Sequence, residues 1–281
     1  MTVLTPLRLD GALAALASDP SLTVVAGGTD LMVEVNSGRR RPTGLLSLRR
    51  VDELRRWRRD GDELVIGAGV TYTSLLDPGF AALAPALAQA ARTVGSPQIR
   101  NAGTLGGNLA TSSPAGDTLP VLAALDATVE LAHADDDRRM VALDDFLTGP
   151  KTNVLRPGEL IVAVRIPVAA GPQEYLKIGV RNAMVIAVAS CALVVDWSRR
   201  RVACACGSVG PRPVSDRRAE AALAAEIDWD SRRAHSASAG ERFGRSMARA
   251  VTPIDDHRAT AAYRREATAV LARRAVERAL T

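Results

Sequence analysis

Two glycine-rich turns, each beside hydroxyl, amide and carboxylate side chains, most constrain what this chain can fold into. The first lies in residues 24–31 and the second in residues 104–108. Glycine lets the backbone approach a ligand closely and leaves its N–H group unhindered, which suits an anion. A strand is expected at residues 22–26 and a helix at 29–35, with Thr29 as the N-cap and Asp30 in its first turn. A strand, a glycine turn and a helix start in this order predict a holder of a phosphate-bearing redox cofactor.

Length and composition favour an ordinary globular protein. The chain has 281 residues, enough for two domains, and 47% of them are hydrophobic. Its formal net charge is +5, but acidic and basic residues are mixed along the chain. The densest basic run, at residues 55–59, is interpreted as a solvated turn before a strand at 63–66. Nucleic-acid binding stays open as an alternative.

The common catalytic and metal-binding motifs are absent from the sequence. It contains no P-loop, no Gly-x-Gly-x-x-Gly after the first strand, no His-Glu-x-x-His and no Gly-x-Ser-x-Gly. The histidines His133, His235 and His257 lie in polar stretches where exposure is expected. Cys204 and Cys206 lack the further ligands that zinc or an iron–sulfur cluster needs, so they are expected to share one buried face of a strand. We therefore predict no catalytic residue and no metal ligand.

Periodicity and turn residues give a coarse order of elements. The segment 95–114 is expected to be mostly loop, an acidic turn at 135–137 should close a hairpin, and 168–172 reads as a linker. No leader peptide is recognisable and no apolar run is long enough to span a bilayer, so a cytoplasmic, soluble protein is expected. Further strands are expected at 45–48, 63–68, 128–131, 140–142, 159–166, 174–181, 187–197 and 201–208, and helices at 71–76, 81–94, 118–125, 216–225 and 261–280.

The two glycine motifs, taken with later landmarks, resemble the FAD-binding subunit of molybdenum hydroxylases. This family includes xanthine dehydrogenase and the medium subunit of carbon monoxide dehydrogenase. The resemblance implies an α+β fold: a two-subdomain FAD-binding domain of the PCMH type at residues 1–168, with subdomains at about 1–50 and 51–168. A carbon monoxide dehydrogenase flavoprotein-type C-terminal domain, an antiparallel sheet with helices, would follow at 172–281. The segments that carry the resemblance are 26–31, 104–109, 113–117, 157–161, 165–167 and 175–177, with Arg181.

The resemblance also implies which residues contact the FAD. The first turn would wrap the pyrophosphate with its backbone amides. Thr104, Gly107 and Asn108 would bind the other side of the diphosphate and the ribityl region. Asp117 would accept hydrogen bonds from sugar or ribityl hydroxyls, and Ile161 would lie against a ring edge. The residues of the first turn are Val24, Val25, Ala26, Gly27, Gly28, Thr29, Asp30 and Leu31.

Two further positions concern the flavin ring. The resemblance places Lys177 near the flavin, where an ammonium would stabilise the anionic reduced form and raise the reduction potential. The alternatives for Lys177 are a surface lysine, or a lysine that merely pairs with Glu174. Some relatives have an aromatic residue ahead of the second glycine motif, where this chain has Val94, so the chain departs from the family at that position.

The function that the resemblance implies is electron transfer within a multi-subunit oxidoreductase. Molybdopterin and [2Fe-2S] clusters would belong to partner subunits, and the FAD of this chain would pass electrons to NAD or another acceptor. The stretch 111–117 favours a xanthine dehydrogenase type. A carbon monoxide, nicotinate or aldehyde dehydrogenase subunit is one alternative, and a non-catalytic flavin-binding scaffold is another. The substrate, the terminal acceptor and the subunit stoichiometry are not predicted.

Overall fold

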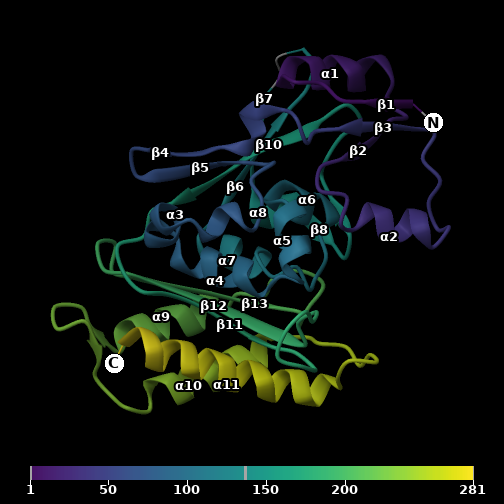
Figure 1. Cartoon of the computed structure of the whole chain (residues 1–281). Coiled ribbons are helices and arrows are strands. Elements are labelled where there is room, and N and C mark those ends of the chain that lie inside the picture. The colour runs from purple at the N-terminus through teal and green to yellow at the C-terminus, as the bar shows by residue number, and fades with distance from the viewer. Residues whose placement is uncertain (1, 136–137, 281) are drawn as a thin grey trace. The chain divides into compact units, whose positions relative to one another are not determined.

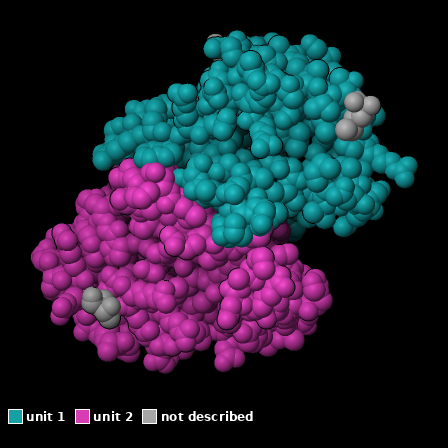
Figure 2. All heavy atoms as spheres, in the orientation of Figure 1, with its two compact units in different colours: residues 1–74, 97–112, 127–167 teal, residues 75–96, 113–126, 168–281 magenta. Residues whose placement is uncertain are grey.

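The computed structural model describes residues 2–135 and 138–280, and the chain divides into two compact units (Figures 1 and 2). Unit 1 comprises residues 1–74, 97–112 and 127–167, and unit 2 comprises residues 75–96, 113–126 and 168–281. The acidic turn predicted at 135–137 lies partly outside the described residues. Within the described residues, no helix combines the length and apolar character that crossing a membrane requires.

Unit 1 begins with a small parallel sheet that carries the first glycine turn. Its strand order is β1-β3-β2, and helix α1 packs on it through Ala12, Leu13 and Leu16, in one cluster with Leu46. The strands predicted at 22–26 and 45–48 are confirmed as β2 and β3. The predicted N-cap is wrong, because α2 starts only after Asp30, and none of its described residues is buried. The bounds are β1 Thr2–Leu4, α1 Leu9–Ser18, β2 Thr23–Val25, α2 Leu31–Asn36 and β3 Gly44–Ser47.

The rest of unit 1 is built on a five-stranded antiparallel sheet of order β4-β5-β10-β6-β7. The basic run at 55–59 was predicted as a turn, but its residues 57–59 belong to edge strand β4, which pairs with β5, and Arg55 ends η1. The segment predicted as loop at 95–114 holds two short helices, α5 and α6. The bounds are η1 Asp52–Arg55, β4 Trp57–Asp60, β5 Glu63–Gly67, α5 Pro97–Ala102, α6 Leu105–Thr111, β6 Thr128–Ala132, β7 Arg138–Ala142, α8 Leu143–Phe146, β8 Leu147–Gly149, β9 Thr152–Asn153 and β10 Leu160–Pro167.

Unit 2 is a three-stranded antiparallel meander, β11-β12-β13, covered by helices on both faces (Figure 1). Helices α4 and α7 contact one face, and α9, α10 and α11 build the apolar cluster on the other. The predicted meander and the helix at 261–280 are confirmed, whereas the helix predicted at 81–94 is two helices that Pro85 separates. The bounds are α3 Pro78–Leu83, α4 Pro85–Thr93, α7 Leu119–Ala124, β11 Gln173–Ile178, β12 Ala189–Asp196, β13 Arg201–Gly207, α9 Arg217–Ala225, β14 Ile227–Asp228, β15 Arg233–Ala234, α10 Ala239–Ala250 and α11 Ala261–Leu280; η2, Ser74–Leu76, crosses the boundary of the units.

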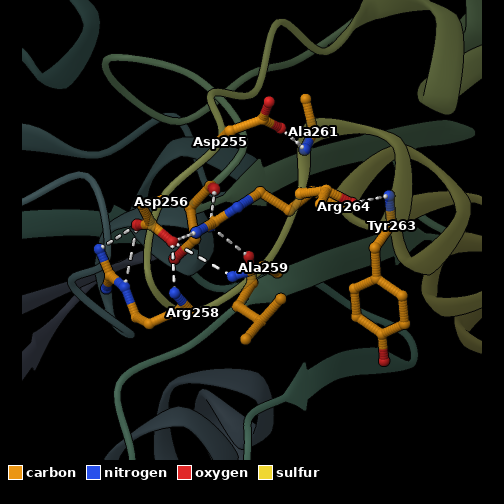
Figure 3. Close-up of polar contacts among 10 residues, drawn as sticks. Asp255, Asp256, Arg258, Ala259, Ala261, Tyr263 and Arg264 are labelled. Atoms are coloured by element: carbon orange, nitrogen blue, oxygen red, sulfur yellow. Dashed lines mark hydrogen bonds and ion pairs between the residues drawn. The ribbon is translucent and has the colours of Figure 1, made fainter.

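A carboxylate fixes the loop that leads into α11 (Figure 3). Asp256 accepts hydrogen bonds from the backbone N–H groups of Arg258 and Ala259 and from both arginines nearby, Arg258 and Arg264. Arg264 is almost fully buried and also donates to the carbonyls of Val188 and Ser208. Burial opposes the charge of Asp256, but these donors outweigh it and hold the pKa of Asp256 well below its ordinary value. This network therefore ties the start of β12 to the last helix.

The α+β class predicted from the sequence is confirmed, since helices cover antiparallel sheets in both units.

Candidate functional site

The first glycine turn leaves its backbone donors open. Val24 and Val25 end β2, residues 26–30 form the turn, and Leu31 starts α2. Within the part of the chain that the structure describes, the backbone N–H groups of residues 26–31 have no acceptor. Gly28 has φ +72°, in the left-handed region that favours glycine. Unpaired and half-exposed N–H groups in succession are what an anion requires.

The turn keeps its shape by close contact with the segment that precedes α6. A Cβ added at Gly27 would lie 1.9 Å from the carbonyl oxygen of Ala102 and 2.9 Å from the backbone nitrogen of Gly103. The hydroxyl of Thr111, at the end of α6, donates to Asp30 Oδ2 over 3.0 Å. The two glycine motifs, far apart in the sequence, therefore lie side by side within unit 1.

The second glycine motif uses its own donors inside the chain. Leu105 N–H donates to the carbonyl of Val70 and Gly106 N–H to that of Ala68. Gly107 N–H donates to the hydroxyl of Thr104, the N-cap of α6. A Cβ at Gly106 would lie 2.6 Å from the Cβ of Ala68, so this glycine permits close packing. The bare amides expected at both turns are thus present at the first one only.

The C-terminal end of α6 has support that the sequence reading did not identify. Ser112, almost fully buried and at φ +47°, ends the helix. The side-chain amide of Asn153 donates to the carbonyl of Ala110 and to the hydroxyl of Ser112, each over 3.0 Å. Asn153 comes from β9, far away in the sequence, so no local pattern could have predicted this contact.

Unit 2 brings two further predicted residues together. Asp117 precedes α7 and Lys177 lies on β11, and Lys177 Nζ is 2.7 Å from Asp117 Oδ2. Both side chains are over nine-tenths buried. The alternative that paired Lys177 with Glu174 is wrong, because Lys177 pairs with Asp117 and Glu174 lies 3.7 Å from Arg278. Lys177 also donates to the carbonyl of Thr93.

A tyrosine that the sequence reading did not select completes this cluster. The hydroxyl of Tyr175 donates to Asp117 Oδ1 over 2.8 Å, so each carboxylate oxygen of Asp117 has a donor. Burial raises the pKa of Asp117, against the lowering effect of Lys177 and Tyr175. Burial, and then the carboxylate, raise the pKa of Tyr175 well above its ordinary value, so the phenol stays a donor. The cluster is a rigid, hydrogen-bonded ion pair.

The remaining candidates fall outside these clusters. Ile161 is buried on β10, opposite Leu131 and beside a register shift in the sheet. Val94 ends α4, where the family resemblance had suggested an aromatic ring. His235 and His257 are exposed, as expected, while His133 is half-buried and lies 3.4 Å from Asp135.

An FAD diphosphate fits the chemistry of the first turn. Its anionic oxygens need hydrogen-bond donors, and residues 26–31 offer unpaired N–H groups, while the carboxylate of Asp30 is engaged by Thr111. Gly27 is fixed by space and Gly28 by its backbone conformation, so neither can carry a side chain without a shift. The donor set of the turn is therefore suited to the pyrophosphate.

The comparisons with known proteins agree with this chemistry. Residues 1–169 match the family described as FAD binding domain in molybdopterin dehydrogenase, and residues 174–279 match the CO dehydrogenase flavoprotein C-terminal domain. The nicotinate dehydrogenase FAD-subunit of Eubacterium barkeri is 36% identical over 71% of each chain. The glyceraldehyde dehydrogenase medium chain of Sulfolobus acidocaldarius is 31% identical, covering 95% of this chain and 94% of its own.

Solved structures resemble the whole chain as well. A chain of the carbon monoxide dehydrogenase of Hydrogenophaga pseudoflava superposes with a TM-score of 0.86 at 29% identity, covering 99% of this chain and 96% of that one. Other matching relatives are named as subunits of carbon monoxide and xanthine dehydrogenases. The names of the relatives thus span several substrates, but they agree on an oxidoreductase subunit. The chain belongs to the family of FAD-binding medium subunits of molybdenum hydroxylases.

Proposed function

We propose that this chain is the electron-transfer subunit of a molybdenum hydroxylase complex. FAD, when bound, supplies chemistry that accepts electrons singly and delivers them in pairs. Partner subunits would carry the molybdopterin and the [2Fe-2S] clusters, and NAD or another acceptor would receive the electron pair. The observation that carries the proposal is the row of unpaired N–H groups at residues 26–31, which the contact of Gly27 with Ala102 keeps in place.

In unit 1, the proposed FAD contacts are those that the sequence suggested. Residues 24–31 bind the pyrophosphate through the backbone. Thr104, Gly107 and Asn108, at the start of α6, bind the other side of the diphosphate and the ribityl region. Ile161 supplies an apolar contact for a ring edge. The hydrogen bond from the Gly107 N–H to the Thr104 hydroxyl fixes the start of α6, which carries these proposed contacts.

In unit 2, the proposed contacts are Asp117 and Lys177. Asp117 accepts hydrogen bonds from ribityl or sugar hydroxyls, because a carboxylate oxygen has lone pairs beyond those used by Tyr175 and Lys177. Lys177 places a positive charge near the flavin and favours its reduced, anionic form. Because Asp117 already pairs with Lys177, part of that charge is compensated. We also propose the domain boundary near residues 168–172, which the ends of the two family matches at 169 and 174 support.

The substrate class is a proposal of its own. The stretch 111–117 favours a complex of the xanthine dehydrogenase type. Relatives named for nicotinate and glyceraldehyde support the alternatives equally well. Because the substrate reacts at the molybdenum subunit, that subunit decides between them.

The test is to assemble the chain with its iron–sulfur and molybdenum partner chains and to follow the flavin absorbance. Xanthine, nicotinate, an aldehyde and carbon monoxide are added in turn, and NAD⁺ is added afterwards. We expect one substrate to bleach the flavin through the partner chains, and an acceptor to restore the colour. A complex that holds FAD but never reduces it would contradict electron transfer and favour the alternative of a non-catalytic flavin-binding scaffold. A complex that assembles with no FAD in this chain would overturn the proposal altogether.

A further inference from the structure

Three cysteine side chains meet on one face of the sheet in unit 2. The antiparallel register places Cys191 of β12 directly opposite Cys206 of β13, and Cys204 lies two residues before Cys206 on the same face. The sulfur atoms of Cys191 and Cys204 are 3.5 Å apart, and all three sulfurs lie within 4.8 Å of one another. The sequence showed only the pair at 204 and 206, because the pairing of β12 with β13 is what adds the third thiol.

The surroundings of the three sulfurs are closed and largely apolar, and the buried carboxylate of Glu220 lies nearby, where it accepts a hydrogen bond from the backbone N–H of Cys204 over 2.9 Å. Each of the three cysteines has no exposed surface, and all are free thiols. They belong to the apolar cluster that α9, α10 and α11 form on this face of the sheet (Figure 1). Among the described residues, no histidine or carboxylate joins the group. The ligand atoms that this group brings together are therefore the three soft sulfurs.

The number and type of these ligands select the kind of ion. Three sulfurs bound in a plane at about 2.3 Å from an ion are about 4 Å from each other, which the observed spacing reaches with small adjustments. Zinc in structural sites takes four ligands, and this group supplies three. Soft sulfur ligands suit copper(I), zinc and iron–sulfur clusters, and of these copper(I) does not require a fourth cysteine. We propose that Cys191, Cys204 and Cys206 form a buried three-sulfur site for a soft monovalent ion, copper(I).

Binding at this site involves no change of oxidation state. Copper(I) displaces thiol protons, and each thiolate that forms releases one proton to solvent. The first thiolate neutralises the monovalent ion, and each further sulfur that binds as a thiolate adds one negative charge. Because uncompensated charge in apolar surroundings is costly, the bonds to the ion must offset that cost.

The test uses the full chain with its FAD, grown with added copper and then incubated anaerobically with a coloured copper(I)–chelator complex. The loss of colour from the chelator complex measures how much copper(I) moves to the protein. Elemental analysis then measures how much copper remains bound to the protein after desalting. We expect one copper per chain, a higher melting temperature, and copper X-ray absorption that shows three sulfur neighbours at about 2.3 Å. No retained copper, or a copper bound by nitrogen or oxygen, would overturn the proposal.

Variants locate the ion. The triple replacement Cys191→Ala, Cys204→Ala and Cys206→Ala should reduce the copper content from one per chain to none. The matched control is Val202→Ala, which removes side-chain volume from the same strand and the same apolar cluster but keeps the thiols. The control should keep its copper, and a triple variant that keeps it as well would refute the assignment. If the triple variant does not fold, the absorption spectrum of the unaltered chain decides alone.

Discussion

Replacing Gly27 with alanine tests the contact on which the proposed phosphate site depends. The new Cβ would lie 1.9 Å from the oxygen and 2.5 Å from the carbon of the Ala102 carbonyl. These are backbone atoms, so no side chain can rotate away. The turn at 26–31 and the segment before α6 must separate by about 1 Å or more before the contact becomes tolerable.

The magnitude follows from that displacement. Overpacking of this kind costs about 1–3 kcal/mol of folding free energy. A shift of about 1 Å also takes N–H donors out of the 2.7–3.2 Å range in which they bind an oxygen. Hydrogen bonds to charged groups contribute about 1.5–3 kcal/mol each, so losing one weakens FAD binding at least about tenfold. We expect both effects in Gly27→Ala.

The assay is a titration of the flavin-free chain with FAD, followed by flavin fluorescence, with urea unfolding measured on the same samples. Gly38→Ala is the control for Gly27→Ala. Gly38 lies outside the turn at 26–31 and has φ +72°, but nothing lies within 4 Å of its Cβ position. The Gly38→Ala variant should lower the free energy of unfolding by about 1–2 kcal/mol, because alanine is strained in the left-handed conformation. Its FAD affinity should be unchanged. Full FAD affinity in Gly27→Ala, or an equal loss in Gly38→Ala, would refute the reasoning.

Three other substitutions test the remaining contacts. Lys177→Met leaves the Asp117 carboxylate buried without its cation, so unfolding free energy measured in urea should fall by about 3–5 kcal/mol, and adding Asp117→Asn should restore part of it. The pKa of Asp256 is lower in the folded chain than in the unfolded one, so its ionised carboxylate stabilises the folded state. That stabilisation is complete above the ordinary Asp pKa of about 3.9 and is lost as the pH falls below it, and Asp256→Asn removes it. Thermal melts from pH 6 to pH 3 should therefore fall less steeply for this variant than for the original chain, and equal slopes would contradict the assignment. Asn108→Ala should lower the FAD content while circular dichroism shows the helices intact, since Thr104 still caps α6; unchanged FAD content would remove Asn108 from the site.

Long, strongly patterned elements could be predicted from the sequence. Helix α11 runs over the predicted residues 261–280, and its buried positions recur along one face, as at Leu271, Ala275 and Ala279. The meander was visible because Ser198 to Arg200 separate two apolar strands. Where local pattern and tertiary structure agree, the sequence is sufficient.

Elements that depend on distant partners were predicted wrongly or not at all. Strand β4 is polar on its surface and exists because it pairs with β5. Helix α1 was not predicted, although its buried residues, Ala12, Leu13 and Leu16, have helical spacing. In the site, the backbone turns could be located, but the pairing of Asp117 with Tyr175 could not, because 58 residues separate them.

Glycine explains why the turn at Gly28 was predicted and why helices α6 and α10 were not, because glycine serves two purposes in this chain. At Gly28 a positive φ marks a turn, which is the meaning that sequence reading assigns to glycine. At Gly106 and Gly244 the glycine sits inside a helix and allows another backbone to approach: a Cβ would lie 2.7 Å from the oxygen of Ala68 and 2.3 Å from that of Ala269, respectively. Both helices, α6 and α10, were therefore missed. The two motifs at the site differ in the same way: the N–H group of Gly106 donates to the carbonyl of Ala68, whereas the N–H group of Gly28 is available for a ligand.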